Sequence, residues 1–134
     1  MSPTIVLHQG RPFLALGSPG GATIITTVLQ TLLDRIDFGL SLPDAIAAPR
    51  ASNLNSSNTS AEPAFLAQYG SELSSSFGQS FASTPEIGAE TGIEFLPNGQ
   101  LEAAAEPVRR GGGDAEVVCP ASAGEHCSRA RRHR

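Results

Sequence analysis

The chain has 134 residues, which fits one domain, and its formal net charge is -4 with nine basic residues that are all arginine. No apolar run reaches the about 18 residues that a membrane-spanning helix needs, and the N-terminus lacks the features of a signal peptide. The sequence therefore predicts a protein without a membrane partner, and it leaves the localisation unknown.

The first predicted element is a β-hairpin. Thr4 to His8 and Pro12 to Leu16 have the composition of strands, and Gln9-Gly10-Arg11 forms the turn between them. Both strands are apolar on nearly every side chain, which is typical of strands buried on both faces of a sheet.

The run Gly17-Ser18-Pro19-Gly20-Gly21 joins this hairpin to a long helix that is predicted over residues 22–38 and capped by Gly39. Seven apolar side chains recur with helical spacing and are expected to be buried as one stripe: Ile24, Ile25, Val28, Leu29, Leu32, Leu33 and Ile36. A strand that passes through two glycines into a helix leaves backbone N–H groups that can hold a carboxylate or an oxyanion. The run lacks the features of a nucleotide-binding loop, and a purely structural tight turn is the alternative.

The chain from residue 43 to residue 118 predicts short elements that are joined by turns. In order they are a helix over 43–48, an exposed loop over 51–61, an irregular helix within 62–77, a hairpin of strands 91–96 and 101–105, and a strand over 115–118. The Asn-Gly pair between the two hairpin strands is a strong turn signal.

The remaining residues, 119–134, are predicted to form a disordered basic tail after a folded portion that covers residues 1–118. Solvated charge is favoured over nucleic-acid binding for the tail arginines, because the rest of the chain is acidic. Cys119 and Cys127 lie in this tail, where two free thiols are favoured over a local disulfide.

Other candidate chemistry is disfavoured by spacing. The histidines are scattered, and Cys119, His126 and Cys127 lack the spacing of a zinc site, so neither a metal nor a cofactor is predicted. Arg109-Arg110 could bind an anion, but an exposed turn is favoured. Ser2 could become an N-terminal nucleophile after removal of Met1, but an ordinary start is favoured.

Several segments taken together resemble a known family. They are Met1-Ser-Pro-Thr-Ile-Val, the run from Gly17 to Gln30, Asp37-Phe-Gly, Ala48-Pro-Arg50, and later Gly99, Glu106-Pro107 and Arg109-Arg110-Gly111. This pattern resembles the C-terminal part of the small, catalytic subunit of γ-glutamyltranspeptidase (glutathione hydrolase) over about residues 1–118, although residues 51–90 match poorly.

The resemblance implies an α+β fold: an incomplete N-terminal-nucleophile hydrolase (αββα) fold, with an antiparallel sheet packed on helices. Family members cleave themselves into a large and a small subunit, and the new N-terminal threonine attacks γ-glutamyl amides such as glutathione through an acyl-enzyme. The implied partners are the substrate, the rest of the small subunit and the large subunit. Family members are commonly periplasmic, secreted or surface-bound.

By the same resemblance, Gly20 and Gly21 supply oxyanion-hole amides. The family's threonine lies in a Thr-Thr-His context upstream of the segments present here. We therefore expect a fragment of the enzyme that is inactive alone. The alternative is a non-catalytic partner that complements a separately encoded large fragment.

Overall fold

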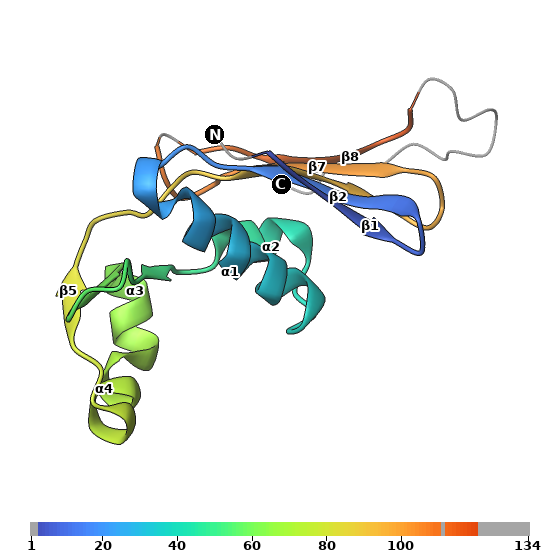
Figure 1. The fold of residues 1–134 in the computed structure, drawn as a ribbon. Helices are drawn as coiled ribbons and strands as arrows, with labels where there is room; N and C mark the ends of the chain where they lie inside the picture. Colours follow the sequence, from blue (N-terminus) through green and yellow to red (C-terminus); the bar gives the residue numbers. More distant parts are fainter. Residues whose placement is uncertain (1–2, 111, 121–134) are drawn as a thin grey trace.

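The computed structural model describes residues 3–110 and 112–120. Its main feature is a five-stranded antiparallel sheet in the order β1 (Thr4–His8), β2 (Arg11–Gly17), β6 (Thr91–Phe95), β7 (Leu101–Ala105) and β8 (Ala115–Val118). A 3₁₀ turn, η1 (Gly21–Thr23), leads into α1 (Ile24–Ile36), which with α2 (Leu42–Ala47) lies against one face of the sheet (Figure 1). No described helix or strand covers the other face.

Both predicted hairpins and the last predicted strand are confirmed. Gln9 and Gly10 form the β1–β2 turn with φ of 52° and 77°, and the left-handed Gly99 (φ 83°) closes the β6–β7 turn. The two-residue turn at Gln9-Gly10 matches the twist of its strands, whereas Pro97-Asn98-Gly99 is a three-residue turn that ends in a left-handed glycine. The observed α+β arrangement corresponds to one helix layer and one sheet of the expected αββα fold.

The hydrophobic core lies between the sheet and α2. Its buried members are Leu14 and Leu16 from β2, Leu42 and Ile46 from α2, and Ala104 from β7. Ser41 caps α2, because its hydroxyl accepts from the Asp44 N–H at 3.2 Å.

The expectation that both strands of the first hairpin are buried on two faces is wrong. Ile5 and Leu7 of β1 are 70% and 60% exposed, because β1 is an edge strand and the open face of the sheet has no cover among the described residues.

The position of α1 is confirmed, and Gly39 (φ 73°) reverses the chain after it. The expected burial of the apolar stripe is wrong for most of its members, because Val28 is the one stripe residue that is fully buried and the helix otherwise buries Thr27 and Thr31. Of the seven apolar side chains, four are exposed: Ile25, Leu29, Leu33 and Ile36.

A second, smaller sheet lies beyond α1, in the order β3 (Ala51–Ser52), β4 (Thr59–Ala61) and β5 (Phe81–Ser83). β3 and β4 pair antiparallel, whereas β4 and β5 pair parallel. The loop expected over 51–61 is therefore confined to residues 53–58, which are exposed.

The irregular helix expected within residues 62–77 is confirmed as three joined pieces. They are α3 (Pro63–Phe65), the π-helical η2 (Leu66–Gly70) and α4 (Ser71–Phe77). Gly78 ends α4 in the left-handed conformation.

No helix among the described residues is long and apolar enough to cross a membrane. Cys119 is disulfide-bonded, which corrects the expectation of a free thiol there. The rest of the predicted tail, residues 121–134 with Cys127, His126 and His133, lies outside the described residues.

Candidate functional site

The junction of β2 and α1 has the backbone geometry that its glycines allow. Gly20 has φ 144° and Gly21 has φ 60°, conformations that residues with a side chain rarely adopt. A Cβ atom on Gly20 would lie 2.8 Å from Thr23 Oγ1, whereas one on Gly21 would meet nothing within 4 Å. The backbone therefore favours glycine at both positions, and Gly20 also lacks the space for a side chain.

The N–H groups of Gly20 and Gly21 take no part in the internal hydrogen bonds of the junction. Thr23 donates from its N–H (3.2 Å) and its hydroxyl (3.0 Å) to the Gly20 carbonyl, which ties that carbonyl to the helix start. Neither glycine N–H has an acceptor among the described residues, and Gly21 is exposed. Two donors thus remain available to a bound group at the head of α1.

A second segment, residues 87–90, packs beneath this junction. Ser18 Oγ donates to the Pro19 carbonyl (2.7 Å) and accepts from the Ala89 N–H (3.2 Å), so it joins the two segments. Gly88 (φ 67°) fits closely, since a Cβ there would lie 2.8 Å from Thr27 Oγ1 and 2.9 Å from Ser18 Oγ. The sequence gives no local signal of this support, because residues 18 and 89 are far apart in the chain.

Five buried charged residues fix residues 87–90 to the rest of the fold. The members of this buried charge cluster are Arg50, Glu62, Glu90, Glu106 and Arg109. Arg109 forms a bidentate pair with Glu62, and Arg50 Nη1 donates to the Ile87 carbonyl at 2.9 Å. Arg50 Nη1 also lies 3.0 Å from Glu106 Oε2, and Thr31 donates to Glu90. Thr31, on the polar face of α1, is buried because it meets this cluster.

The cluster shifts the pKa values of Glu62 and Glu90 in opposite directions. Burial opposes ionisation of Glu62, but the hydrogen bonds from Arg109 and from the Arg50 and Ile87 N–H groups hold its pKa below the usual value. Burial raises the pKa of Glu90, although the Thr31 hydrogen bond and Arg50 oppose the rise. The charge of Glu62 therefore strengthens the cluster at neutral pH, whereas the charge of Glu90 is disfavoured by its surroundings.

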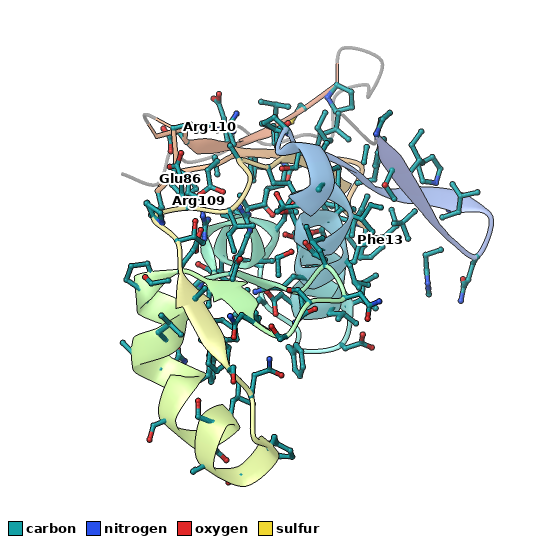
Figure 2. All side chains as sticks on the ribbon, turned by 60° about the vertical axis from the view of Figure 1, so that its left-hand side comes forward. Phe13, Glu86, Arg109 and Arg110 are labelled. Carbon is teal, nitrogen blue, oxygen red and sulfur yellow. The ribbon has the colours of Figure 1, made fainter. Side chains whose placement is uncertain are left out.

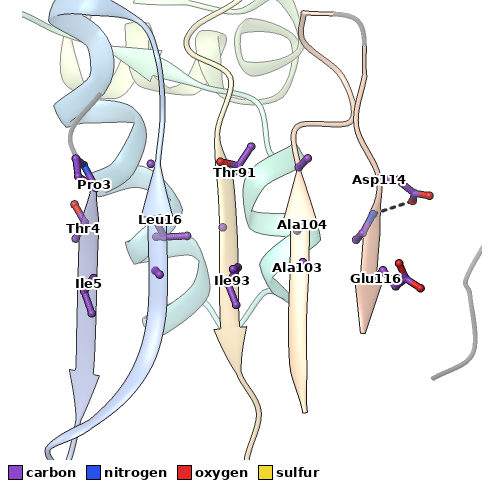
Figure 3. A pocket seen from close by; sticks show the side chains of 15 residues that line it. Pro3, Thr4, Ile5, Leu16, Thr91, Ile93, Ala103, Ala104, Asp114 and Glu116 are labelled. Carbon is purple, nitrogen blue, oxygen red and sulfur yellow. Dashed lines mark hydrogen bonds between the residues drawn. The ribbon is translucent and has the colours of Figure 1, made fainter. Parts of the chain in front are cut away.

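The open face of the five-stranded sheet forms a shallow apolar cavity of about 660 Å³ that reaches Gly17, at the start of the glycine run. Residues of five adjacent strands form one row across it, from Ile5 through Ala15, Ile93 and Ala103 to Glu116, as the strand register and Figure 3 show. The glycine junction thus lies beside an uncovered apolar surface.

The other candidates of the sequence analysis are not assembled into a site. Arg109 is 4% exposed within the buried charge cluster, so the exposed turn favoured for Arg109-Arg110 is wrong for the first arginine. Arg110 is exposed and lies 4.0 Å from Glu86 (Figure 2). His8 is exposed, no group of metal-binding side chains occurs within residues 3–110 and 112–120, and Ser2 lies outside the described residues.

Comparison with known proteins decides the family. The family model of gamma-glutamyltranspeptidase matches residues 1–116, nearly the whole chain. The chain belongs to the γ-glutamyltranspeptidase family. The glutathione hydrolase proenzyme of Escherichia coli K12 is 36% identical over 107 residues, which are 80% of this chain and 18% of that protein. The same-named protein of Bacillus subtilis 168 is 36% identical over 113 residues, 83% of this chain and 19% of that protein.

Solved structures agree with the family. The γ-glutamyltranspeptidase of Pseudomonas nitroreducens, complexed with L-DON, has a TM-score of 0.71 at 31% identity and matches 84% of this chain and 60% of its own. The cephalosporin acylase of Bacillus halodurans has a TM-score of 0.74 at 24% identity, matches 90% of this chain and 22% of its own, and supports the fold alone. The chain spans less than one fifth of the length of the two curated γ-glutamyltranspeptidase relatives above.

Proposed function

We propose that this chain supplies the oxyanion-hole loop of an enzyme that cleaves γ-glutamyl amides such as glutathione. In this proposal the N–H groups of Gly20 and Gly21 hold the oxygen that becomes negatively charged when the amide carbonyl is attacked. The observation that supports it best is that both donors are without an acceptor in the described part of the chain and lie at a helix start.

The attacking group of the proposed reaction has to come from outside these 134 residues. The family resemblance implies a threonine in a Thr-Thr-His context, and the sequence has no Thr-Thr-His. Thr26 and Thr27 cannot replace it, because both are inside α1 and the Thr27 hydroxyl donates to the Thr23 carbonyl. The chain alone is therefore expected to be inactive, with the nucleophile on a segment that joins it in the complete enzyme.

A chromogenic substrate, γ-glutamyl-4-nitroanilide, tests both parts of the proposal. The 134-residue chain alone should hydrolyse it at the uncatalysed rate, and turnover clearly above that rate would refute the claim of inactivity. Mixed with an E. coli glutathione hydrolase proenzyme that lacks the segment matched here, the chain should restore turnover.

Substitution at the junction then tests the role of the loop. Gly21→Pro removes one proposed donor and should lower the restored turnover by about 10²-fold or more. Gly10→Pro is the matched control, because Gly10 also has positive φ but lies at the opposite end of β2. Equal losses in the two variants would show that Gly21 has no special part in the reaction.

A second candidate function is that of a non-catalytic partner, which docks on the rest of the small subunit and the large subunit. The uncovered sheet face and the exposed apolar side of α1 favour it. Burial of Leu29 and Leu33, now 52% and 41% exposed, would contribute about 0.7–1.5 kcal/mol each to such a complex, half of what a fully exposed leucine gains.

The two functions are distinguished by variants of these exposed side chains. Leu29→Glu should leave the isolated chain folded and should weaken its complex with the truncated E. coli protein, measured by analytical ultracentrifugation. If the complex forms and activity is insensitive to Gly21→Pro, the chain is a partner only. If no complex forms, the partner function fails.

A further inference from the structure

A separate cavity of about 600 Å³ lies at the C-terminal end of α1, where the chain after the helix and the segment α3–η2–α4 face each other. This volume is within the range of small-molecule sites. Asp34, which lines it, lies 13 residues along the helix from Gly21, or about 20 Å at the usual rise per residue. The cavity is therefore distinct from the glycine junction.

The walls of this cavity are mainly apolar and aromatic. Phe38 contributes from the end of α1, and Phe65, Tyr69 and Leu73 contribute from the facing segment. The Phe65 and Tyr69 rings lie 5.1 Å apart between centroids and are tilted by 56°, a normal aromatic pair. Such rings offer π faces to a cation that enters the cavity.

Besides the Tyr69 hydroxyl, two polar side chains line the cavity, and they differ in whether they have partners. Gln30 is fully engaged, because its Nε2 donates to the Pro49 carbonyl (2.8 Å) and its Oε1 accepts from the Ala51 N–H (3.3 Å). Asp34 is the one charged side chain of the lining, and its Oδ2 is buried without a hydrogen-bond partner among the described residues. The nearest compensating charge, Arg50, is used by Glu90 and Glu106. A carboxylate with a buried oxygen that lacks a donor is costly to ionise, and a cation close to the carboxylate lowers that cost.

We propose that this cavity binds a small organic cation, an ammonium group on an aromatic or aliphatic body. The ammonium would donate to the Asp34 carboxylate, and the body would lie against Phe65 and Tyr69. Neither Gly20 nor Gly21 lines this cavity, so the proposal does not depend on the proposed enzymatic function.

Isothermal titration of the 134-residue chain with 2-phenylethylammonium tests the proposal, with 2-phenylethanol as the neutral analogue of the same shape. The ammonium should bind at least tenfold more tightly than the alcohol, and Asp34→Asn should remove that preference. Asp37→Asn is the matched control, because Asp37 is an exposed carboxylate at the end of the same helix and should leave binding unchanged.

The folded state of each variant is checked by its thermal transition, so that loss of binding is not confused with unfolding. A second variant, Tyr69→Ala, should weaken both probes, because it removes part of the wall and leaves the carboxylate in place. Equal affinity for ammonium and alcohol would overturn the proposal, as would an unchanged preference in Asp34→Asn or the absence of binding at millimolar concentration.

Discussion

The most informative perturbation of this fold is Glu62→Gln, because Glu62 accepts hydrogen bonds from three separate parts of the chain. Its Oε1 accepts from the Ile87 N–H (2.7 Å) and from Arg109, and its Oε2 accepts from the Arg50 N–H (2.9 Å) and again from Arg109. A glutamine turned either way places its NH₂ group against a backbone N–H and a guanidinium, so two hydrogen bonds are lost and Arg109 keeps only Glu106 as a charged partner.

Breaking one partner of a buried ion pair costs about 3–5 kcal/mol, a large part of the roughly 5–15 kcal/mol that stabilises a typical domain. We therefore expect the free energy of unfolding, measured by urea denaturation followed by circular dichroism, to fall by that amount. Glu86→Gln is the control, because the exposed Glu86–Arg110 pair at 4.0 Å should contribute less than about 1 kcal/mol. A loss below about 1 kcal/mol in Glu62→Gln would refute the structural role of the cluster.

The effect of Glu62 also has a defined pH dependence. Because the folded-state pKa of Glu62 is lowered, its contribution is fully present above the unfolded value of about 4.5 and is lost as the pH falls through the lower folded value. The stability difference between wild type and Glu62→Gln should thus persist down to about pH 4.5 and narrow below it. A difference that disappears already at pH 6 would contradict this assignment.

Three further variants test other parts of the fold, each by urea denaturation. Gly20→Ala should lower the free energy of unfolding by about 1–3 kcal/mol from backbone strain alone. The loss should be larger than that of Gly10→Ala, whose added methyl group meets open space. Equal losses in the two variants would contradict the close fit of the junction. Gly92→Ala should lower the free energy of unfolding by about 1–3 kcal/mol, because its Cβ would lie 2.5 Å from Leu16 Cδ2. An unchanged stability would show that the Leu16 side chain can move aside. Asp34→Asn should raise the free energy of unfolding by about 0.3–1 kcal/mol at pH 7, because burial raises the pKa of Asp34 and its negative charge opposes the helix dipole. This gain should vanish at low pH, where Asp34 of the wild-type chain is protonated. A gain that persists at low pH would exclude this cause.

The elements that the sequence predicted correctly are those with local signals. The turn at Gln9-Gly10, the Asn98-Gly99 turn and the cap at Gly39 each depend on residues that are neighbours in the chain. The short strand β5 was missed because it has three residues and pairs in parallel with a strand about twenty residues earlier. A periodic pattern within one short segment cannot predict a pairing between distant segments.

In the candidate site, too, the parts with local signals could be predicted and the parts built from distant residues could not. Gly20 and Gly21 were predicted because the strand, the glycines and the helix are contiguous, although their chemical role remains a proposal. The buried charge cluster could not be predicted, since Glu62 and Arg109 are 47 residues apart and each, taken alone, has the composition of an exposed surface. Burial of a charge is a property of the assembled partners, and a single sequence shows only one partner at a time.

The error in the burial of α1 has a physical cause that bears on the function. An amphipathic pattern shows that a helix has an apolar side, but the element that this side contacts is decided by the rest of the assembly. Here Thr27 and Thr31 contact the interior because Glu90 and Gly88 lie beneath them, and the apolar side, including Leu29, is left outside. An apolar stripe of this size on the outside of a helix that supports a proposed oxyanion hole is hard to reconcile with an isolated chain. An exposed apolar stripe is expected if α1 carries the glycine junction at its start and contacts a further segment of the proposed enzyme through this stripe. In that case assembly and the proposed catalysis both depend on α1.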